Sequence, residues 1–389
     1  MSSLRIGVFF GGRSVEHEVS VLTAQQVMSA LDATEHGAVP VYIAKSGRWY
    51  TGDALRDVEQ FRDVDRLIGS LSEVRMDPSP DSAGVLHTAA RPGLFGGRRD
   101  DARIDMAMPL VHGSHGEDGT LQGLFELCDL PYTGCGVAAS AVSMDKPLAK
   151  EVLRSAGLPV LEHALVHRAA WRSSQQQLVT AINERVRFPA FVKPATLGSS
   201  IGVSSVDGDA ALVDAVELAL TYDSRCLVEP AMDGAADVNC SVLGRGAEAR
   251  ASVCERPVSS GLLSYADKYL SKGHAQKSGR TGMKGAQREI PAPIGEATTH
   301  RIQDAALSAF RAIGCEGVVR VDFLVSGERF VVNEVNTIPG SLSFYLWEPS
   351  GVPFPELLET LVALGLRRHE EKRATTFSID TWLLRGRPD

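Results

Sequence analysis

The sequence lacks the features that would place the protein in a membrane, outside the cell or on nucleic acid. No apolar run approaches the roughly 18 residues that suggest a membrane-spanning helix. Met1 is followed almost at once by an expected strand, without the basic and apolar regions of a signal peptide. The net charge of −8 argues against a general nucleic-acid binder, whose domain is normally basic. We therefore expect a cytoplasmic protein with no membrane or nucleic-acid partner.

Other absences narrow the chemistry. The six cysteines form no CxxC pair and have no histidine at metal-binding spacing, so they are expected to be reduced and buried. There is no internal repeat and no low-complexity tract. The length of 389 residues suggests two or three domains, and the content of 44% apolar and 23% charged residues is ordinary for a globular protein.

The first third of the sequence alternates apolar runs with a helical pattern. Residues 4–10 are expected to form a strand, Gly11-Gly12 a turn, and the residues from Ser14 onward a helix with apolar positions at helical spacing. Further strands are expected at residues 39–44 and 104–111. This order predicts a parallel, doubly wound first domain.

Two segments of that first domain carry many turn-forming residues. Residues 52–103 are charged and rich in Gly, Pro and Ser, so they are expected to form an elaborated surface excursion. Residues 112–119 form a glycine-rich loop, and a helix is expected to begin at Thr120.

The Gly11-Gly12 turn could bring backbone amides close to an anion at the start of a helix. It does not match a nicotinamide-dinucleotide fingerprint, because the third glycine and the acid that closes the second strand are missing. Glu16, near the tip of the loop, is a candidate ligand for the ammonium group of a substrate. The alternative is an ordinary acid in the first turn of a helix, where acids are favoured.

The most informative segment lies near the C-terminus, where two short apolar runs are joined by a turn at residues 326–328. Alternation along a strand places Arg320 and Asp322 on one face, and likewise Glu334 and Asn336. Two carboxylates and an amide oxygen suit Mg²⁺, and an adjacent arginine suits a transferring phosphate. A surface salt-bridge ladder on a half-exposed sheet is the alternative interpretation.

The middle of the sequence carries a phosphate-binding pattern. An apolar strand ends at Lys193, and the loop at residues 195–203 that follows is rich in small residues with free amides and hydroxyls. The lysine precedes the glycines, so the pattern is not a Walker loop. Residues 225–230 are expected to form a strand that enters a hinge, where a free backbone edge can hydrogen-bond an adenine ring.

Taken together and in this order, the motifs resemble those of the D-alanine–D-alanine ligase family of ATP-grasp enzymes. The resemblance covers nearly the whole chain and is carried by residues 9–20, 112–123, 130–134, 143–146, 192–202, 268–270, 288–292, 320–322 and 333–340. It implies an α/β, ATP-grasp fold with three α/β domains and ATP between the central and C-terminal domains. The expected boundaries are residues 1–134, 135–232 and 233–389.

The resemblance also implies a role for individual residues. Substrate binding is expected from Glu16, His112, Ser199, Ser341 and Ser343. ATP binding is expected from Lys146, Lys193, Ser200, Glu229, Asp237 and Lys268. Catalytic roles fall to Glu16, Ser199, Tyr269, Arg320 and Gly340, and metal binding to Asp322, Glu334 and Asn336. The implied cofactors are ATP and two Mg²⁺ ions, for which Mn²⁺ is a possible substitute.

Two positions depart from the family pattern. After Gly340 the family continues through a longer segment with a serine-leucine pair that receives the second substrate, whereas here the chain is shorter and more aromatic. Phe344, Tyr345 and Trp347 either line the acceptor pocket, which predicts loose acceptor selection, or belong to the core. Asp237 lies about one position away from the place where the family has the acid that binds the ribose of ATP.

The function implied is an ATP-dependent ligase that joins two D-alanines through an acyl phosphate, for peptidoglycan precursor synthesis and hence cell-wall biogenesis and cell shape. A related ligase with another second substrate or a specialised-metabolite role is the first alternative, and a catalytically inactive nucleotide-binding protein is the second. The expected partners are small amino-acid substrates and a second copy in a homodimer. The glycine content and basic charge of residues 265–285 predict a lid over ATP, and a merely solvated basic loop is the alternative.

Overall fold

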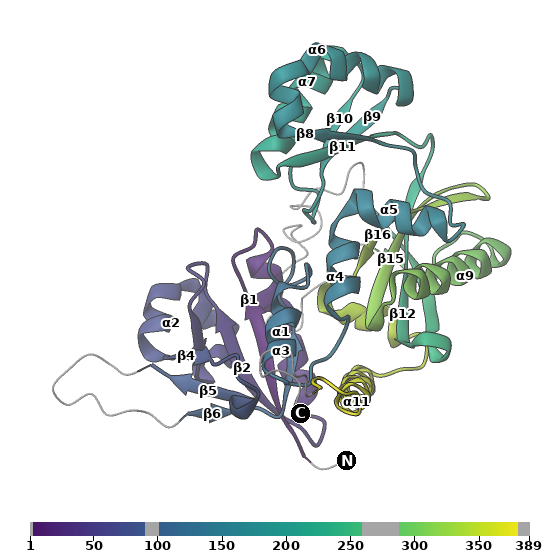
Figure 1. Cartoon of the computed structure of the whole chain (residues 1–389). Coiled ribbons are helices and arrows are strands. Elements are labelled where there is room, and N and C mark those ends of the chain that lie inside the picture. Colours follow the sequence, from purple (N-terminus) through teal and green to yellow (C-terminus); the bar gives the residue numbers. More distant parts are fainter. Residues whose placement is uncertain (1–2, 90–100, 259–287, 380–389) are drawn as a thin grey trace, which may run out of the picture.

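The structure is a computed structural model that describes residues 3–89, 101–258 and 288–379. These residues form three β-sheets with helices packed against them (Figure 1). None of the helices within the described residues is long and apolar enough to cross a membrane. All six cysteines are buried and free, as expected.

The first sheet has seven strands in the order β6-β5-β4-β3-β2-β1-β7. Its parallel part consists of β1 (Arg5–Gly11), β2 (Gly37–Ile43) and β7 (Met106–Pro109), as the apolar runs predicted. The helices that follow β1 and β7 are α1 (His17–Leu31) and α3 (Thr120–Leu127). The carboxyl ends of β1 and β7 therefore meet at one edge of the sheet, beside the start of α1.

The rest of this sheet corrects the expectation of a surface excursion and a purely parallel first domain. Residues 52–103 contribute antiparallel strands, which extend the sheet together with β3. Strand β3 (Trp49–Thr51) ends just before this segment, which itself contains η1 (Asp53–Arg56), η2 (Val58–Arg62), α2 (Val64–Ser70), β4 (Ser72–Met76), η3 (Pro80–Ser82), β5 (Val85–Thr88) and β6 (Ala102–Arg103). The turn-forming residues connect strands that are too short to show a periodic pattern, yet Val74 and Leu86 are fully buried.

The second sheet is antiparallel, in the order β10-β9-β11-β8, and stands at the top of Figure 1 with its two long helices on one side. Its elements are β8 (Ala164–His167), α6 (Arg168–Arg185), β9 (Ala190–Pro194), β10 (Ser204–Val206), α7 (Asp209–Tyr222) and β11 (Arg225–Pro230). Trp171 and Val216 lie in its own apolar core. The strands expected before Lys193 and at residues 225–230 are confirmed.

The third sheet is also antiparallel, in the order β14-β13-β12-β15-β16. Its strands are β12 (Ala236–Arg245), β13 (Arg250–Pro257), β14 (Arg288–Glu289), β15 (Glu316–Ser326) and β16 (Arg329–Asn336). It packs against α4 (Val137–Met144), α5 (Lys146–Ser155) and α9 (Glu296–Ile313) (Figure 1). The remaining elements are η4 (Gly246–Glu248), η6 (Gly340–Ser343), α10 (Phe344–Trp347) and α11 (Phe354–Arg373).

The first and third sheets share one apolar core. Ile6, Phe10 and Met28 belong to the same buried cluster as Val318 and Leu358. Because α1 packs against α11 and η6, the start of α1 is held beside the carboxyl end of β16. Helices α4 and α5 lie against the third sheet, although their residues fall within the expected central domain; the domain boundaries themselves stay a prediction.

Candidate active site

Glu16 lies at the N-cap of α1, immediately after the turn that ends β1, and its side chain is buried. Two glycine-containing loops enclose its carboxylate. A Cβ atom at Gly113 would lie 2.6 Å from Glu16 Oε2, and one at Gly198 would lie 2.9 Å from the same oxygen. Any side chain at these positions would displace the carboxylate, so both glycines are needed for the backbone to approach it.

Ser199 completes this cradle. Its hydroxyl donates a hydrogen bond to Glu16 Oε1. Ser199 and Ser200 both have positive φ angles, of 54° and 58°, in the loop that follows β9. The loop at residues 195–203, which follows β9 of the second sheet, therefore lies against the N-terminus of α1, which follows β1 of the first sheet. The resemblance implied this contact.

His112 follows β7 and is buried, with 3% of its surface exposed. Its Nε2 atom lies 3.0 Å from the Thr23 hydroxyl of α1. Burial lowers the pKa of His112 to about 4, a hydrogen bond to the backbone of Ile338 opposes that shift, and the charge of Arg320 adds to it. The ring is therefore neutral near pH 7 and lies between the first sheet and the segment after β16.

A buried group of charges lies on the second sheet and α5. Glu229 on β11 forms two ion pairs. Its Oε2 lies 2.7 Å from Lys193 Nζ of β9, and its Oε1 lies 2.5 Å from Lys150 Nζ of α5. Burial favours the neutral acid, but the two lysines outweigh it and lower the pKa of Glu229 to about 2. Lys193 Nζ also donates to Asn333 Oδ1 of β16 at 3.2 Å. The carboxylate thus holds Lys193 in its charged form beside the third sheet.

Lys146 is the second expected phosphate ligand. It begins α5, where Asp145 caps the helix by accepting the Leu148 amide at 3.1 Å. Its Nζ donates to the Leu197 carbonyl in the loop after β9. Burial lowers its pKa, although Glu334 and Glu16 oppose that shift. Lys146 therefore reaches the loop after β9 from α5, and Lys193 lies on the strand that leads into the same loop.

The predicted hairpin places its four polar residues as expected. Arg320 pairs with Asn336 and Asp322 with Glu334 across the two strands. The Arg320 guanidinium donates two hydrogen bonds to Asp322, from Nε at 2.6 Å and from an Nη at 2.7 Å. Asp322 is only 8% exposed, so this ion pair is buried and is not the surface salt-bridge ladder of the alternative interpretation.

The donor set fits Mg²⁺. Within the described residues no three His, Cys, Asp or Glu side chains cluster closely enough to hold a metal by themselves. Two carboxylates and one amide oxygen suffice, however, when phosphate oxygens and water complete the octahedron. Asn336 donates Nδ2 to Asp322 at 3.0 Å, which leaves its oxygen for the metal. The residues that would hold the metal are Asp322, Glu334 and Asn336.

The segment after β16 turns sharply. Gly340 begins η6, and the next three residues, Ser341, Leu342 and Ser343, all have φ between 51° and 54°. This left-handed conformation costs a residue with a side chain about 1–2 kcal/mol. Hydrogen bonds hold it: Ser341 N donates to Thr23 Oγ1 at 3.2 Å and Leu342 N to the Pro339 carbonyl at 2.8 Å.

The two serines expected at the acceptor site differ in their surroundings. Both are buried. The Ser343 hydroxyl has no hydrogen-bond partner among the described residues. A buried, unpaired hydroxyl is costly, so Ser343 is the better candidate for a substrate ligand.

The aromatic residues that follow belong to the core. Trp347 is 1% exposed and donates its Nε1 proton to Ser241 Oγ at 3.0 Å. The Tyr345 hydroxyl lies 2.9 Å from Glu255 Oε1, and Phe344 stacks on Phe354 with ring centroids 4.5 Å apart. Their burial favours the interpretation that these three residues belong to the core. It removes the basis for an acceptor pocket lined by aromatic side chains.

Four further expected residues receive less support from the described structure. Lys268, Tyr269 and the expected lid at residues 265–285 lie outside the described residues. Ser200 lies in the loop after β9 and Asp237 on β12, where the charge of Asp237 contributes to raising the pKa of Lys193.

Sequence reasoning missed a glutamate that joins the two halves of the site. Glu117 accepts hydrogen bonds from Gly113 N at 2.8 Å and from Ile338 N at 3.0 Å. Burial and then the charge of Glu16 raise its pKa to about 8. The only signal for it was its place inside a glycine-rich motif. Lys150 was also missed, although it lies one helical turn after Lys146.

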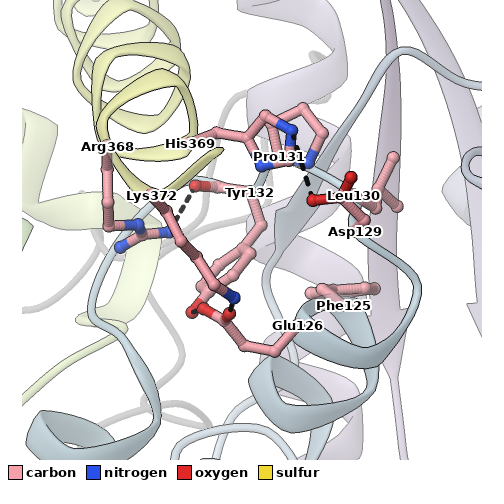
Figure 2. Close-up of a pocket in the computed structure, with 9 residues that line it drawn as sticks. All are labelled: Phe125, Glu126, Asp129, Leu130, Pro131, Tyr132, Arg368, His369 and Lys372. Atoms are coloured by element: carbon pink, nitrogen blue, oxygen red, sulfur yellow. Dashed lines mark hydrogen bonds and ion pairs between the residues drawn. The ribbon is translucent and has the colours of Figure 1, made fainter. Parts of the chain in front are cut away.

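A separate hollow between α3 and α11 contains none of the expected site residues (Figure 2). Arg368 spans its edge, donating to the carbonyls of Tyr132 at 2.7 Å and Gly134 at 2.6 Å and lying over the Tyr132 ring. Lys372 pairs with Glu126 there. The charged groups satisfy one another, so this feature fastens the C-terminal helix to the first sheet.

Comparison with known proteins decides the family. The family model for the D-ala D-ala ligase N-terminus matches residues 5–135, and the model for the D-ala D-ala ligase C-terminus matches residues 152–363. The chain belongs to the D-alanine–D-alanine ligase family. D-alanine–D-alanine ligases from Thermosipho melanesiensis and Chlorobium phaeovibrioides are 35% and 37% identical to it, over 98% and 94% of this chain and 98% of each relative.

Solved structures of the family share its ATP-grasp fold. The D-alanine–D-alanine ligase from Coxiella burnetii superimposes with a TM-score of 0.76 at 33% identity, over 96% of this chain and 97% of that one. The VanG D-Ala:D-Ser ligase from Enterococcus faecalis also gives 0.76, at 30% identity, over 93% and 99%. The names of these two proteins differ in the second amino acid, which is D-alanine in one and D-serine in the other.

Proposed function

We propose that this protein is an ATP-dependent ligase that joins two D-alanines, in the cytoplasm, for peptidoglycan precursor synthesis. One observation carries the proposal. The buried Glu16 carboxylate, enclosed by Gly113, Gly198 and Ser199, lies close to Lys146 and Glu334, which would bind phosphate and magnesium. Many family relatives bear the D-alanine–D-alanine ligase name.

The donor D-alanine would place its ammonium group on Glu16. The glycines leave no room beside this carboxylate for a large group, so the space favours a small amino acid. His112 would lie beside the donor carboxylate, and Tyr269 with Ser199 would complete the hydrogen-bonded set. Because the ring of His112 is neutral, it adds no charge that would compete with Arg320.

ATP would lie between the second and third sheets. Lys146 and Lys193 would neutralise its phosphates, together with Ser200 from the loop after β9 and with Lys268, and Glu229 and Asp237 would face the nucleoside. Two Mg²⁺ ions, or Mn²⁺, held by Asp322, Glu334 and Asn336 would supply charge neutralisation for phosphoryl transfer. These roles rest on the resemblance and on the convergence of the residues.

The reaction follows from these placements. A carboxylate oxygen of the donor attacks the γ-phosphorus of ATP, which gives an acyl phosphate and ADP. The amine of the acceptor then attacks the acyl carbon, and the tetrahedral intermediate expels inorganic phosphate. Arg320 and the amide of Gly340 would donate hydrogen bonds to the oxyanion of that intermediate. No enzyme nucleophile is required.

D-Serine is the second candidate for the acceptor. The VanG structure is a D-Ala:D-Ser ligase, and the unpaired Ser343 hydroxyl could bind an acceptor carboxylate or hydroxyl equally well. A site that hydrogen-bonds a substrate group discriminates more strongly than an apolar wall. We therefore expect a defined acceptor preference. We also propose that the protein forms a homodimer, which is checked by its mass in solution.

The test is a product screen. The purified protein is incubated with ATP, Mg²⁺ and single or paired D- and L-amino acids, and the products are identified by mass spectrometry. We expect D-alanyl-D-alanine, with one phosphate released per dipeptide. ATP binding without phosphate release would favour a catalytically inactive nucleotide-binding protein, and a mixed product as the main species would favour the alternative ligase.

A further inference from the structure

Three residues, the N-cap residue of α1 and two residues within the helix, lie on the side of α1 that faces the site. Glu16, Ser20 and Thr23 are spaced by four and three positions, which places them on the same side of a helix. Ser20 donates to the Leu110 carbonyl at 2.6 Å and accepts the Gly11 amide at 2.8 Å, so it fixes the helix to the strand ends. Thr23 is also buried, with 2% of its surface exposed, but its hydroxyl contacts segments other than the strand ends.

The hydroxyl of Thr23 joins two distant segments. Ser341 N donates to Thr23 Oγ1 at 3.2 Å, and His112 Nε2 lies 3.0 Å from the same oxygen. A threonine hydroxyl has one proton to give and two lone pairs. Since the oxygen accepts the Ser341 amide, its proton is available for His112.

The other bond of the His112 ring completes the assignment. The ring also hydrogen-bonds the backbone of Ile338, whose amide already donates to Glu117 Oε1 at 3.0 Å, so the ring faces the Ile338 carbonyl. A ring nitrogen that faces a carbonyl must donate, and in a neutral imidazole the other nitrogen then accepts. The proton order is therefore Ser341 N–H to Thr23 oxygen, Thr23 O–H to His112 Nε2, and the second ring N–H to the Ile338 carbonyl.

This chain of hydrogen bonds, called the relay below, begins and ends on the same turn. Its two ends, Ile338 and Ser341, flank Gly340, whose amide would stabilise the oxyanion. Glu117 accepts the Ile338 amide at 3.0 Å and holds this turn from a third direction. We propose that Thr23 is a positioning residue that fixes the Gly340 turn through His112 and Ser341. The inference rests on the proposed function, because it concerns the orientation of the Gly340 amide.

Thr23→Val keeps the shape of the side chain and replaces the hydroxyl by a methyl group, and Thr23→Ser keeps the hydroxyl. The readouts are the single-turnover rate of dipeptide formation, the KM for each D-alanine and the thermal midpoint. Because the amide acts on the transition state, we expect Thr23→Val to lower the rate at least tenfold and to change each KM less than threefold. Thr23→Ser should stay within threefold of the wild-type rate.

Thr34→Val is the matched control. The Thr34 hydroxyl donates to the Leu31 carbonyl at 2.7 Å at the far end of α1, so its loss should leave the rate unchanged. If Thr23→Val does not fold, Thr23→Ala takes its place. In a His112→Ala background Thr23→Val should cost less than in the wild type, since both residues act through one relay.

Four results would overturn the proposal: a wild-type rate in Thr23→Val, a loss confined to KM, an equal loss in Thr23→Ser, or losses that multiply in the double variant. A failure of the proposed function is distinguishable. In that case the wild-type protein forms no dipeptide, whereas a dipeptide formed at the same rate by wild type and Thr23→Val removes only the role of Thr23.

Discussion

The hydroxyl of Ser199 donates a hydrogen bond to the carboxylate of Glu16, although the two residues come from different sheets. Ser199 belongs to the loop after β9 of the second sheet, and Glu16 is the N-cap residue of the helix after β1 of the first. In the proposed function, a substrate ammonium group on Glu16 would therefore lie next to the loop that would cover the phosphates of ATP. The contact would then connect the amino-acid site to the ATP site.

Ser199→Ala should weaken the use of the donor D-alanine. The serine donates a charge-assisted hydrogen bond, and such bonds contribute about 1.5–3 kcal/mol. We expect kcat/KM for D-alanine to fall by about 10- to 100-fold while the thermal midpoint stays within a few degrees. Ser205→Ala, at an exposed position on β10, is the control and should be unchanged. An unchanged kcat/KM in Ser199→Ala would contradict the assignment.

Glu334→Gln should abolish most phosphoryl transfer. The substitution keeps the shape of the side chain opposite Asp322 and removes a charge that the proposed magnesium site would need. We expect phosphate release to fall by orders of magnitude and the magnesium concentration for half-maximal activity to rise. Glu328→Gln, at the exposed turn of the same hairpin, should behave as wild type. Normal turnover in folded Glu334→Gln would disprove the metal assignment.

The acceptor site is tested by Ser343→Ala and Ser341→Ala. The Ser343 hydroxyl is buried without a partner, so its removal costs the free protein nothing and should raise the KM for the acceptor alone. The bond to Thr23 uses the Ser341 amide, which Ser341→Ala retains. Rates are compared with D-alanine as donor and D-alanine or D-serine as acceptor. A larger acceptor effect in Ser341→Ala would reverse the assignment.

Glu229→Gln should destabilise the protein. It leaves Lys150 and Lys193 buried without their counter-charge, and breaking a buried pair in this way costs about 3–5 kcal/mol. Because folding lowers the pKa of Glu229 from its usual 4.5 to about 2, the wild type loses this contribution as the pH falls from about 4.5 toward 2. Urea unfolding measures both effects. Glu184→Gln, on an exposed face of α6, should cost little, and an equal cost would contradict the account.

Arg368→Lys should loosen the C-terminal helix. Arg368 donates to two carbonyls and pairs with Glu316 at 3.2 Å, and the compact ammonium of lysine cannot reproduce this fork. We expect a loss of about 1–3 kcal/mol in the free energy of unfolding, from backbone groups left unpaired. The neighbouring Arg367 is more exposed and pairs with Glu248, so Arg367→Lys is the control. Equal stability of the two variants would contradict the role of Arg368.

The polar hairpin was the part of the site most accessible from sequence. Alternation along a strand fixes which residues share a face, so the grouping of Arg320 with Asp322 and of Glu334 with Asn336 followed from spacing. The pairing of Asp322 with Glu334 did not, because the register shifts between Asp322 and Phe323 and spacing from the turn alone would place Asp322 opposite Asn333. The strand before Lys193 was equally clear, since an apolar run ended at a charged residue. The three-sheet fold followed from the family resemblance.

The contacts between sheets were not accessible in this way. Thr23 and Glu117 acquire their roles from residues more than 200 positions away, and no local pattern marks such a pairing. The strands at residues 72–88 were missed because they are short and their turns dominate the composition. Whether Trp347 lines a pocket or belongs to the core depends on its burial, which the sequence alone left open.

The most direct test of the central claim follows an oxygen atom. D-Alanine labelled with ¹⁸O in its carboxylate is incubated with the protein, ATP and Mg²⁺, and the phosphate and the dipeptide are analysed by mass spectrometry. Activation as an acyl phosphate predicts D-alanyl-D-alanine and one ¹⁸O atom in each phosphate released. Unlabelled phosphate, or phosphate release without the dipeptide, would contradict the account.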